Sequence, residues 1–159
     1  MIFLTVGTQL PFDRLVSAVD RWAGESCRDD VVAQVGETDF VPEHLEWAAR
    51  VTPAEFRQRM SEAELVISHA GMGSILTALE FDKPILVLPR RAALREMRND
   101  HQLATAKWLA DQGRVAVATD EEELVRKLGS LDALASPGQI RKWASEELLT
   151  TLREFIDGG

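Results

Sequence analysis

The chain has one cysteine, Cys27, and therefore cannot form an intrachain disulfide. This agrees with a reducing cytoplasm, where disulfides are rare. The sequence also lacks any apolar run close to the roughly 20 residues that a membrane-spanning helix needs. The start of the chain, Met1 to Val6, carries no basic segment and predicts a strand rather than a secretion signal. These absences favour a cytoplasmic domain, with any membrane anchor supplied by a partner.

Basic residues are also scarce. The 18 Lys and Arg residues stand against 26 Asp and Glu residues, which gives a formal net charge of −8. Nucleic-acid backbones reward clustered Lys and Arg, so this balance argues against a nucleic-acid partner. The hydrophobic content of 45% is too high for a disordered chain. A length of 159 residues suits one domain, and we expect residues 1–159 to form it.

Short apolar strands alternate with helical patterns, and no repeat or linker divides the chain. This alternation predicts an α/β fold with a mostly parallel sheet of about six strands and helices on both faces. The expected strands are 2–6, 31–35, 46–51, 65–68, 85–88 and 115–118. The expected helices are 11–24, 53–60, 74–82, 100–112, a helix after the cap at 119–122, and a C-terminal helix over 139–157.

Two turns that contain glycine follow predicted strands. Gly7-Thr8 comes after the first strand, and Gly71-Met72-Gly73-Ser74 follows the fourth. Ligands of open parallel sheets bind at the carboxyl ends of the strands. A glycine there lets a diphosphate approach backbone N–H groups at the positive end of a helix. Either turn could also be only a tight turn. Neither completes a G-x-G-x-x-G or P-loop pattern, so NAD binding and P-loop hydrolysis lose support.

A run of arginines follows the fifth predicted strand. Its four members, within nine residues, are Arg90, Arg91, Arg95 and Arg98. A solvated surface is one interpretation, but the position at the edge of the expected site favours contact with an anionic substrate or a membrane. The polar residues at the start of the next predicted helix, which could hydrogen-bond sugar hydroxyls, are Asn99, His101 and Gln102.

His69 stands between the fourth strand and its glycine turn. It could polarise a leaving phosphate, and a purely structural histidine is an equal alternative. The sequence has no Cys and His cluster with metal-ligand spacing and no G-x-S-x-G elbow, so it indicates neither a metal site nor a serine hydrolase. Asp13, next to Arg14, is interpreted as a surface or capping acid rather than a base.

Several segments together resemble glycosyltransferase family 28. They are Met1–Thr8, Pro11–Val16, Val66–Ser74, Lys83-Pro84 and Asn99–Gln102. The resemblance runs to about Leu109. Within this family, the sequence more closely resembles the small catalytic subunits of split transferases. One group of these is the bacterial exopolysaccharide glucuronosyl- and galactosyltransferase subunits. The other is the eukaryotic subunit that adds the second N-acetylglucosamine to the dolichol-linked glycan. The resemblance implies a single Rossmann-like domain, the donor-binding half of a GT-B fold.

The resemblance also implies an inverting enzyme whose substrate is a UDP-sugar, with no cofactor and no metal, because backbone N–H groups and a helix dipole neutralise the leaving diphosphate. The implied phosphate-binding residues are Gly7, Thr8, Gly71, Met72, Gly73 and Ser74. The implied catalytic residues are His69 and His101. The implied donor-sugar and ribose contacts are Thr77, Glu80, Asn99, His101 and Gln102. Many family members carry Glu where Thr77 stands, so either Thr77 or Glu80 would hold the ribose.

One domain is half of a GT-B enzyme, so the resemblance implies a second, membrane-anchored subunit that presents a polyprenyl-diphosphate-linked acceptor. The expected reaction moves a hexose-type sugar in exopolysaccharide or capsule assembly at the inner face of the membrane. The helix over 139–157 is a candidate contact with that subunit, and the isolated chain could form homo-oligomers. The alternatives are a non-catalytic nucleotide-binding or adaptor domain and a UDP-sugar 2-epimerase-like enzyme.

Overall fold

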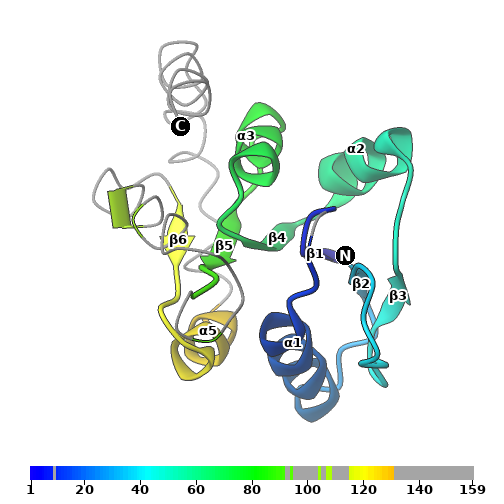
Figure 1. Ribbon diagram of the computed structural model, residues 1–159, viewed down its shortest axis with the longest axis vertical. Helices are drawn as coiled ribbons and strands as arrows, with labels where there is room; N and C mark the ends of the chain where they lie inside the picture. Colours follow the sequence, from blue (N-terminus) through cyan, green and yellow to red (C-terminus); the bar gives the residue numbers. More distant parts are fainter. Residues whose placement is uncertain (9, 92–93, 95–103, 105–106, 109–114, 131–159) are drawn as a thin grey trace.

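The protein, described from a computed structural model, is built on one six-stranded sheet (Figure 1). The described residues are 1–8, 10–91, 94, 104, 107–108 and 115–130. The strands are β1 (Ile2–Thr5), β2 (Val31–Gln34), β3 (Glu46–Ala48), β4 (Leu65–His69), β5 (Ile85–Leu88) and β6 (Ala116–Val117). Their order is β3-β2-β1-β4-β5-β6, and every neighbouring pair is parallel. The predicted sheet is therefore confirmed, and it is fully parallel over the described strands.

Helices cover both faces of the sheet. The described helices are α1 (Asp13–Glu25), α2 (Pro53–Glu62), α3 (Met72–Glu80) and α5 (Glu121–Leu128). In Figure 1, α1 and α5 lie on one side of the strands, and α2 and α3 lie on the other. The start of α2 has a capping box: the Glu55 N–H donates to Thr52 Oγ1 at 3.1 Å, and the Thr52 N–H donates to Glu55 Oε2 at 2.9 Å.

Some boundaries differ from the prediction. Helix α3 begins at Met72, two residues earlier than expected, so Gly71 is its N-cap. Strand β3 ends at Ala48 rather than at residue 51. Of the helix expected at 100–112, only residues 104, 107 and 108 are described, and these are helical. The expected helix at 139–157 lies outside the described residues.

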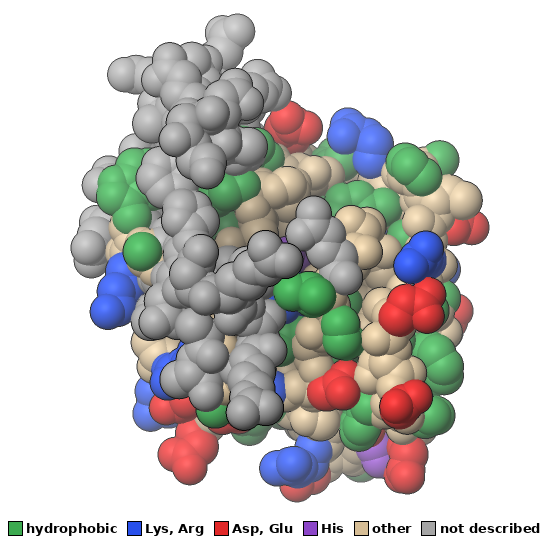
Figure 2. All heavy atoms as spheres, in the orientation of Figure 1, with side chains coloured by type: hydrophobic (Ala, Val, Ile, Leu, Met, Phe, Trp, Pro, Cys, Tyr) green, Lys and Arg blue, Asp and Glu red, His purple; other side chains and the backbone are tan. Residues whose placement is uncertain are grey.

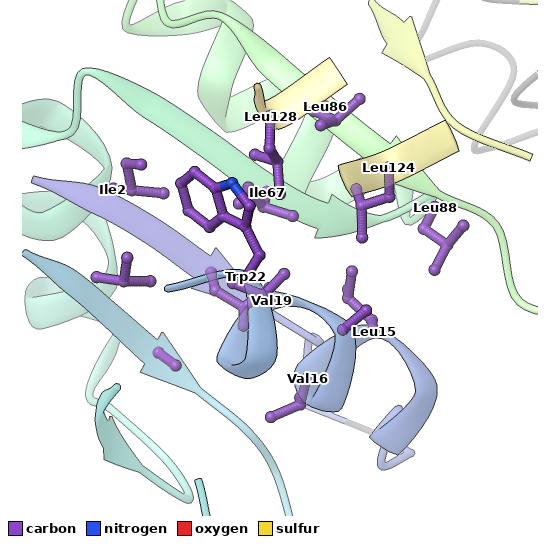
Figure 3. Close-up of a cluster of buried hydrophobic side chains, with 14 of the residues drawn as sticks. Ile2, Leu15, Val16, Val19, Trp22, Ile67, Leu86, Leu88, Leu124 and Leu128 are labelled. Atoms are coloured by element: carbon purple, nitrogen blue, oxygen red, sulfur yellow. The ribbon is translucent and has the colours of Figure 1, made fainter. Parts of the chain in front are cut away.

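The core consists of two clusters, one on each face, because side chains alternate along every strand. In β1, Leu4 packs toward α1 and α5, whereas Phe3 packs toward α2 and α3. Strand β5 repeats this division with Leu86 and Val87. Figure 3 shows the first cluster, with Trp22 of α1 among side chains from β1, β4 and α5. This pattern accounts for the continuous apolar runs in the sequence.

The connections after β1 and β4 leave the sheet on opposite faces. Strand β1 leads to α1, whereas its neighbour β4 leads to α3 on the other side (Figure 1). Such a switch point opens a crevice at the carboxyl ends of the two strands. Within the described part of the chain, no helix is long and apolar enough to cross a membrane.

Candidate functional site

A cavity of about 620 Å³ lies at the carboxyl ends of β1 and β4. This volume is in the usual range for small-molecule sites. The residues that line it come from the β1–α1 loop, the end of β2, the segment before and within α2, the β4–α3 turn with α3, and the residues after β5. They are Val6, Gly7, Thr8, Leu10, Gln34, Val51, Pro53, Phe56, Arg57, His69, Gly71, Gly73, Ser74, Thr77 and Arg90.

The first glycine turn is held in place by side chains below it. Gly7 has φ = +78°, a left-handed conformation that favours glycine. Its N–H donates to Thr5 Oγ1 at 3.2 Å, and the Thr5 hydroxyl donates to Gln34 Oε1 at 2.9 Å. Thr5 and Gln34 are both buried. A short chain of hydrogen bonds from β2 through β1 therefore fixes the start of this turn.

The second glycine turn places the N-terminus of α3 at the cavity. Gly71 is the N-cap and has no side chain with which to bond the first-turn N–H groups. Gly71, Gly73 and Ser74 all line the cavity. A Cβ on Gly73 would meet no other atom within 4 Å, so this glycine keeps space open. The positive end of the helix dipole therefore lies where an anionic group can approach it.

His69 lies between the two turns, with 8% of its surface exposed. A Cβ on Gly7 would come within 2.8 Å of its Cε1 atom, and a Cβ on Gly71 would overlap its Nε2 atom. The Nδ1 atom lies 3.2 Å from Ser68 Oγ. Both turns thus pack directly against the imidazole, which agrees with the structural interpretation of His69 and also places the ring in the cavity wall.

The environment of His69 keeps its imidazole neutral. Burial, and secondly the positive charge of Arg90, lower its pKa from 6.5 to about 4, and a hydrogen bond with the Thr5 backbone partly opposes this shift. At neutral pH the ring therefore carries no charge. Its predicted action on a leaving phosphate is then a hydrogen bond from a neutral imidazole rather than the attraction of an imidazolium.

Arg90 is not part of an exposed basic run, and the expectation that it touches a membrane is corrected. Only 3% of its surface is exposed. Its Nη2 atom donates to the carbonyls of Val6 at 2.9 Å and Leu10 at 2.6 Å, and its guanidinium lies 5.1 Å from the centre of the Phe12 ring. It lines the cavity, so contact with an anion there stays a prediction.

The other arginines of the run differ from Arg90. Arg91 is half-buried, donates to the Thr119 carbonyl and does not line the cavity. Arg95 and Arg98 lie outside the described residues. On the face seen in Figure 2, the described basic and acidic side chains are scattered along the edge rather than gathered in one basic patch.

The two candidates for the ribose contact lie in different places. Thr77 lines the cavity, and its hydroxyl donates to the Gly73 carbonyl at 2.8 Å. Glu80, one turn further along α3, is not among the lining residues and lies 4.0 Å from Arg57. The geometry therefore favours Thr77.

The structure brings most of the predicted phosphate-binding residues together. Those that line the cavity are Gly7, Thr8, Gly71, Gly73 and Ser74. The side chain of Met72 packs in the second core cluster instead, so that only its backbone N–H could serve a ligand. The remaining predicted contacts, which lie outside the described residues, are Asn99, His101 and Gln102.

Part of the cavity wall was missed by reasoning from the sequence. Val51, Pro53, Phe56 and Arg57 form a wall that comes from the start of α2 and the segment before it. Its sequence signal, the Thr52 cap followed by proline, marks a helix start without placing it next to β1 and β4. In the part of the chain described, no group of three or more His, Cys, Asp or Glu side chains could hold a metal ion. The independence from metal stays a prediction.

Comparison with known families now decides the classification. The sequence pattern of the glycosyltransferase family 28 C-terminal domain matches residues 1–147. The chain belongs to this family. The resemblance is thus confirmed, and the match extends past Leu109, where the resemblance was expected to end.

Two relatives carry the same name. The human UDP-N-acetylglucosamine transferase subunit ALG13 is 30% identical over 156 residues, which cover 91% of this chain and 12% of that protein. The subunit of the same name from Yarrowia lipolytica is 28% identical over 141 residues, which cover 78% of this chain and 67% of that protein. The chain therefore spans only about an eighth of the human relative.

Solved structures share the fold. A solution structure of ALG13 superposes with a TM-score of 0.59 at 20% identity, over 84% of this chain and 86% of that chain. UDP-GlcNAc 2-epimerase from Neisseria meningitidis, bound to UDP-GlcNAc, superposes with a TM-score of 0.58 at 15% identity, over 98% of this chain and 42% of that one. At these identities the likeness shows that the domain is one half of a GT-B-type architecture.

Proposed function

We propose that the chain is the donor-binding, catalytic subunit of an inverting glycosyltransferase that takes a UDP-sugar. The observation that carries this proposal is the meeting of two glycine turns and a helix N-terminus in one cavity at the switch point of the sheet. Backbone N–H groups at such a place bind phosphates without a cation. Membership of the glycosyltransferase family adds the reaction class.

The cavity offers separate surroundings for each part of a nucleotide. The diphosphate would lie against Gly7 and the first turn of α3, and the ribose against Thr77. The apolar side chains of Val51 and Phe56 would pack against the base. As the bond to the sugar breaks, negative charge grows on the diphosphate, and the positive end of the α3 dipole at the cavity would stabilise it.

The proposed donor is UDP-N-acetylglucosamine, because the relatives are named as transferase subunits for it. The proposed acceptor is a polyprenyl-diphosphate-linked sugar held by a membrane-anchored partner subunit, which also supplies the general base. The chain would then work as a peripheral protein at the cytoplasmic face of a membrane, in exopolysaccharide or capsule assembly. It would use no metal and no cofactor.

Titration calorimetry with UDP, in buffer that contains EDTA, tests donor binding. We expect micromolar affinity for UDP and binding at least about tenfold weaker for ADP, a difference of about 1.4 kcal/mol. Absence of UDP binding, or strict dependence on a divalent cation, would contradict the proposal.

A second experiment separates transfer from the alternatives. Radiolabelled UDP-N-acetylglucosamine is incubated with membranes that contain the co-expressed partner and, separately, with the chain alone. Label in the lipid fraction only with the partner supports a split transferase. Epimerised donor with the chain alone would indicate the epimerase alternative, and binding without turnover in either sample would indicate an adaptor domain.

A further inference from the structure

Arg90 is the only buried arginine among the described residues. One nitrogen, Nη2, donates to two carbonyls, Val6 O at 2.9 Å and Leu10 O at 2.6 Å. These two carbonyls lie on either side of the turn that contains Gly7 and Thr8. The side chain from the end of β5 therefore fixes both ends of this turn, 84 and 80 residues earlier in the chain.

A second arginine makes the reverse connection. Arg14, in the first turn of α1, donates from Nη2 to the Pro89 carbonyl at 3.0 Å. The guanidinium groups of Arg14 and Arg90 lie 5.4 Å and 5.1 Å from the centre of the Phe12 ring, within the range of a cation–π contact. Each segment thus donates from an arginine to a carbonyl of the other, and both guanidinium groups lie near the Phe12 ring.

The loops joined in this way do not belong to neighbouring strands. Strand β4 lies between β1 and β5, and its own turn carries Gly71. The two arginines therefore connect the loops on either side of the β4–α3 turn. His69 is packed against the first of these loops through Gly7, and the charge of Arg90 acts on its imidazole.

We propose that Arg90 is a positioning residue for the donor diphosphate: it holds the Gly7–Thr8 turn in the wall of the cavity where the diphosphate would bind. This inference rests on the proposed function and deepens it. The planar guanidinium suits the role, because its Nη2 atom reaches both carbonyls while its face stays against an aromatic ring. A lysine would keep the charge and N–H donors but lacks the flat face.

The test compares UDP with uridine, which lacks phosphates. Arg90→Met removes the charge and both hydrogen bonds but leaves an apolar side chain against Phe12. Arg90→Lys keeps the charge. The matched control is Arg21→Met, which removes the charge of an exposed arginine of α1 that does not line the cavity. Affinities are measured by calorimetry for UDP and by NMR titration for uridine, and folding is checked by thermal unfolding.

We expect Arg90→Met to weaken UDP binding at least about tenfold and Arg90→Lys about threefold, while uridine binding changes less than about twofold, where tenfold corresponds to 1.4 kcal/mol. Arg21→Met leaves both affinities unchanged. The pKa of His69, followed by NMR and assigned with His69→Gln, should rise in Arg90→Met and stay low in Arg90→Lys. Should Arg90→Met fail to fold, Arg90→Lys alone decides between the outcomes.

Equal losses for UDP and uridine would overturn the inference, because they would show a general structural role. The inference would also be overturned if both variants, Arg90→Lys and Arg90→Met, bound UDP with unchanged affinity. Failure of the wild-type chain to bind UDP would contradict the proposed function itself. The two failures are distinguishable, because the proposed function fails on wild-type binding of UDP, whereas the inference fails on the comparison of the Arg90 variants.

Discussion

The imidazole of His69 fills the space that a side chain on Gly71 would need. A Cβ on Gly71 would overlap Nε2, although the backbone there has φ = −87°, which any residue adopts. The requirement for glycine at this position therefore comes from the histidine ring and not from the backbone conformation. Gly7 differs, because it has both a positive φ and the ring at 2.8 Å.

The first prediction concerns this packing. Gly71→Ala should destabilise the protein by roughly 2–3 kcal/mol, as expected for overpacking of a buried contact. In the background of His69→Ala the same substitution should cost less than about 1 kcal/mol, because the ring is gone. Urea unfolding of the four proteins measures both costs. An equal cost in both backgrounds would show that something other than His69 excludes the alanine.

The second prediction is a loss of stability in mild acid. The unfolded chain binds a proton at His69 near pH 6.5, whereas the folded chain does so only near pH 4. The unfolded state therefore binds more protons between these values, and stability falls as the pH falls through this window. The slope is about 1.4 kcal/mol per pH unit, and the full loss is about 3 kcal/mol.

His69→Gln provides the control for this prediction, since glutamine does not titrate. The free energy of unfolding of the variant, measured by urea at a series of pH values, should change less between pH 6.5 and pH 4 than that of the wild type. Parallel curves for the two proteins would assign the acid sensitivity to other groups. The pKa values of Asp30 and Glu123 are lowered by Arg28 and by Thr119, so these groups lose their contributions only as the pH falls below their ordinary values of 3.8 and 4.5, at the acid end of this window and beyond it.

The sheet and its helices could be predicted from the sequence because each buried strand is a short apolar run that ends at glycine or proline. Ile2–Thr5 and Leu65–His69 are entirely buried, so the local pattern and the tertiary structure agree. The N-terminal boundary of α3 was predicted less accurately than those strands. Gly71 and Gly73 both resemble N-caps, and only the structure shows that Gly71 is the N-cap, since its carbonyl accepts from the Ile75 N–H at 3.1 Å.

The candidate site was predicted where residue type alone carries the chemistry. Glycines after strands of a parallel sheet favour an anion site, with a tight turn as the alternative. The burial of Arg90 could not be predicted, because the burial of a charge depends on its partners, and these carbonyls belong to Val6 and Leu10, far from Arg90 in the sequence. The wall formed by Val51 and Phe56 was missed for the same reason, since its place follows from the strand order.

The third prediction separates the fold from the site at Gly73. A Cβ there meets nothing within 4 Å, so Gly73→Val should leave the thermal midpoint unchanged or slightly raised, valine being a better helix former by roughly 0.4 kcal/mol. The branched side chain would occupy the approach to the α3 N-terminus, and UDP affinity should fall at least about tenfold. Calorimetry checks this, with Gly73→Ala as the smaller step. Unchanged affinity would place the phosphates elsewhere.

The last prediction decides which residue of α3 holds the ribose. The Thr77 hydroxyl donates its proton to the Gly73 carbonyl at 2.8 Å, so its oxygen is left to accept a hydrogen bond from a ribose hydroxyl. Thr77→Val keeps the shape and removes this oxygen, and UDP affinity should fall about fivefold, the value of one hydrogen bond of about 1 kcal/mol. Glu80→Gln should change the affinity less than about twofold, because Glu80 lies outside the cavity wall beside Arg57.

Calorimetry with UDP and with 2′-deoxy-UDP completes the test. If the ribose 2′-hydroxyl donates the hydrogen bond to Thr77, Thr77→Val should weaken binding of the deoxy compound less than binding of UDP. A larger loss in Glu80→Gln than in Thr77→Val would assign the ribose contact to the carboxylate and require α3 to turn when the nucleotide binds.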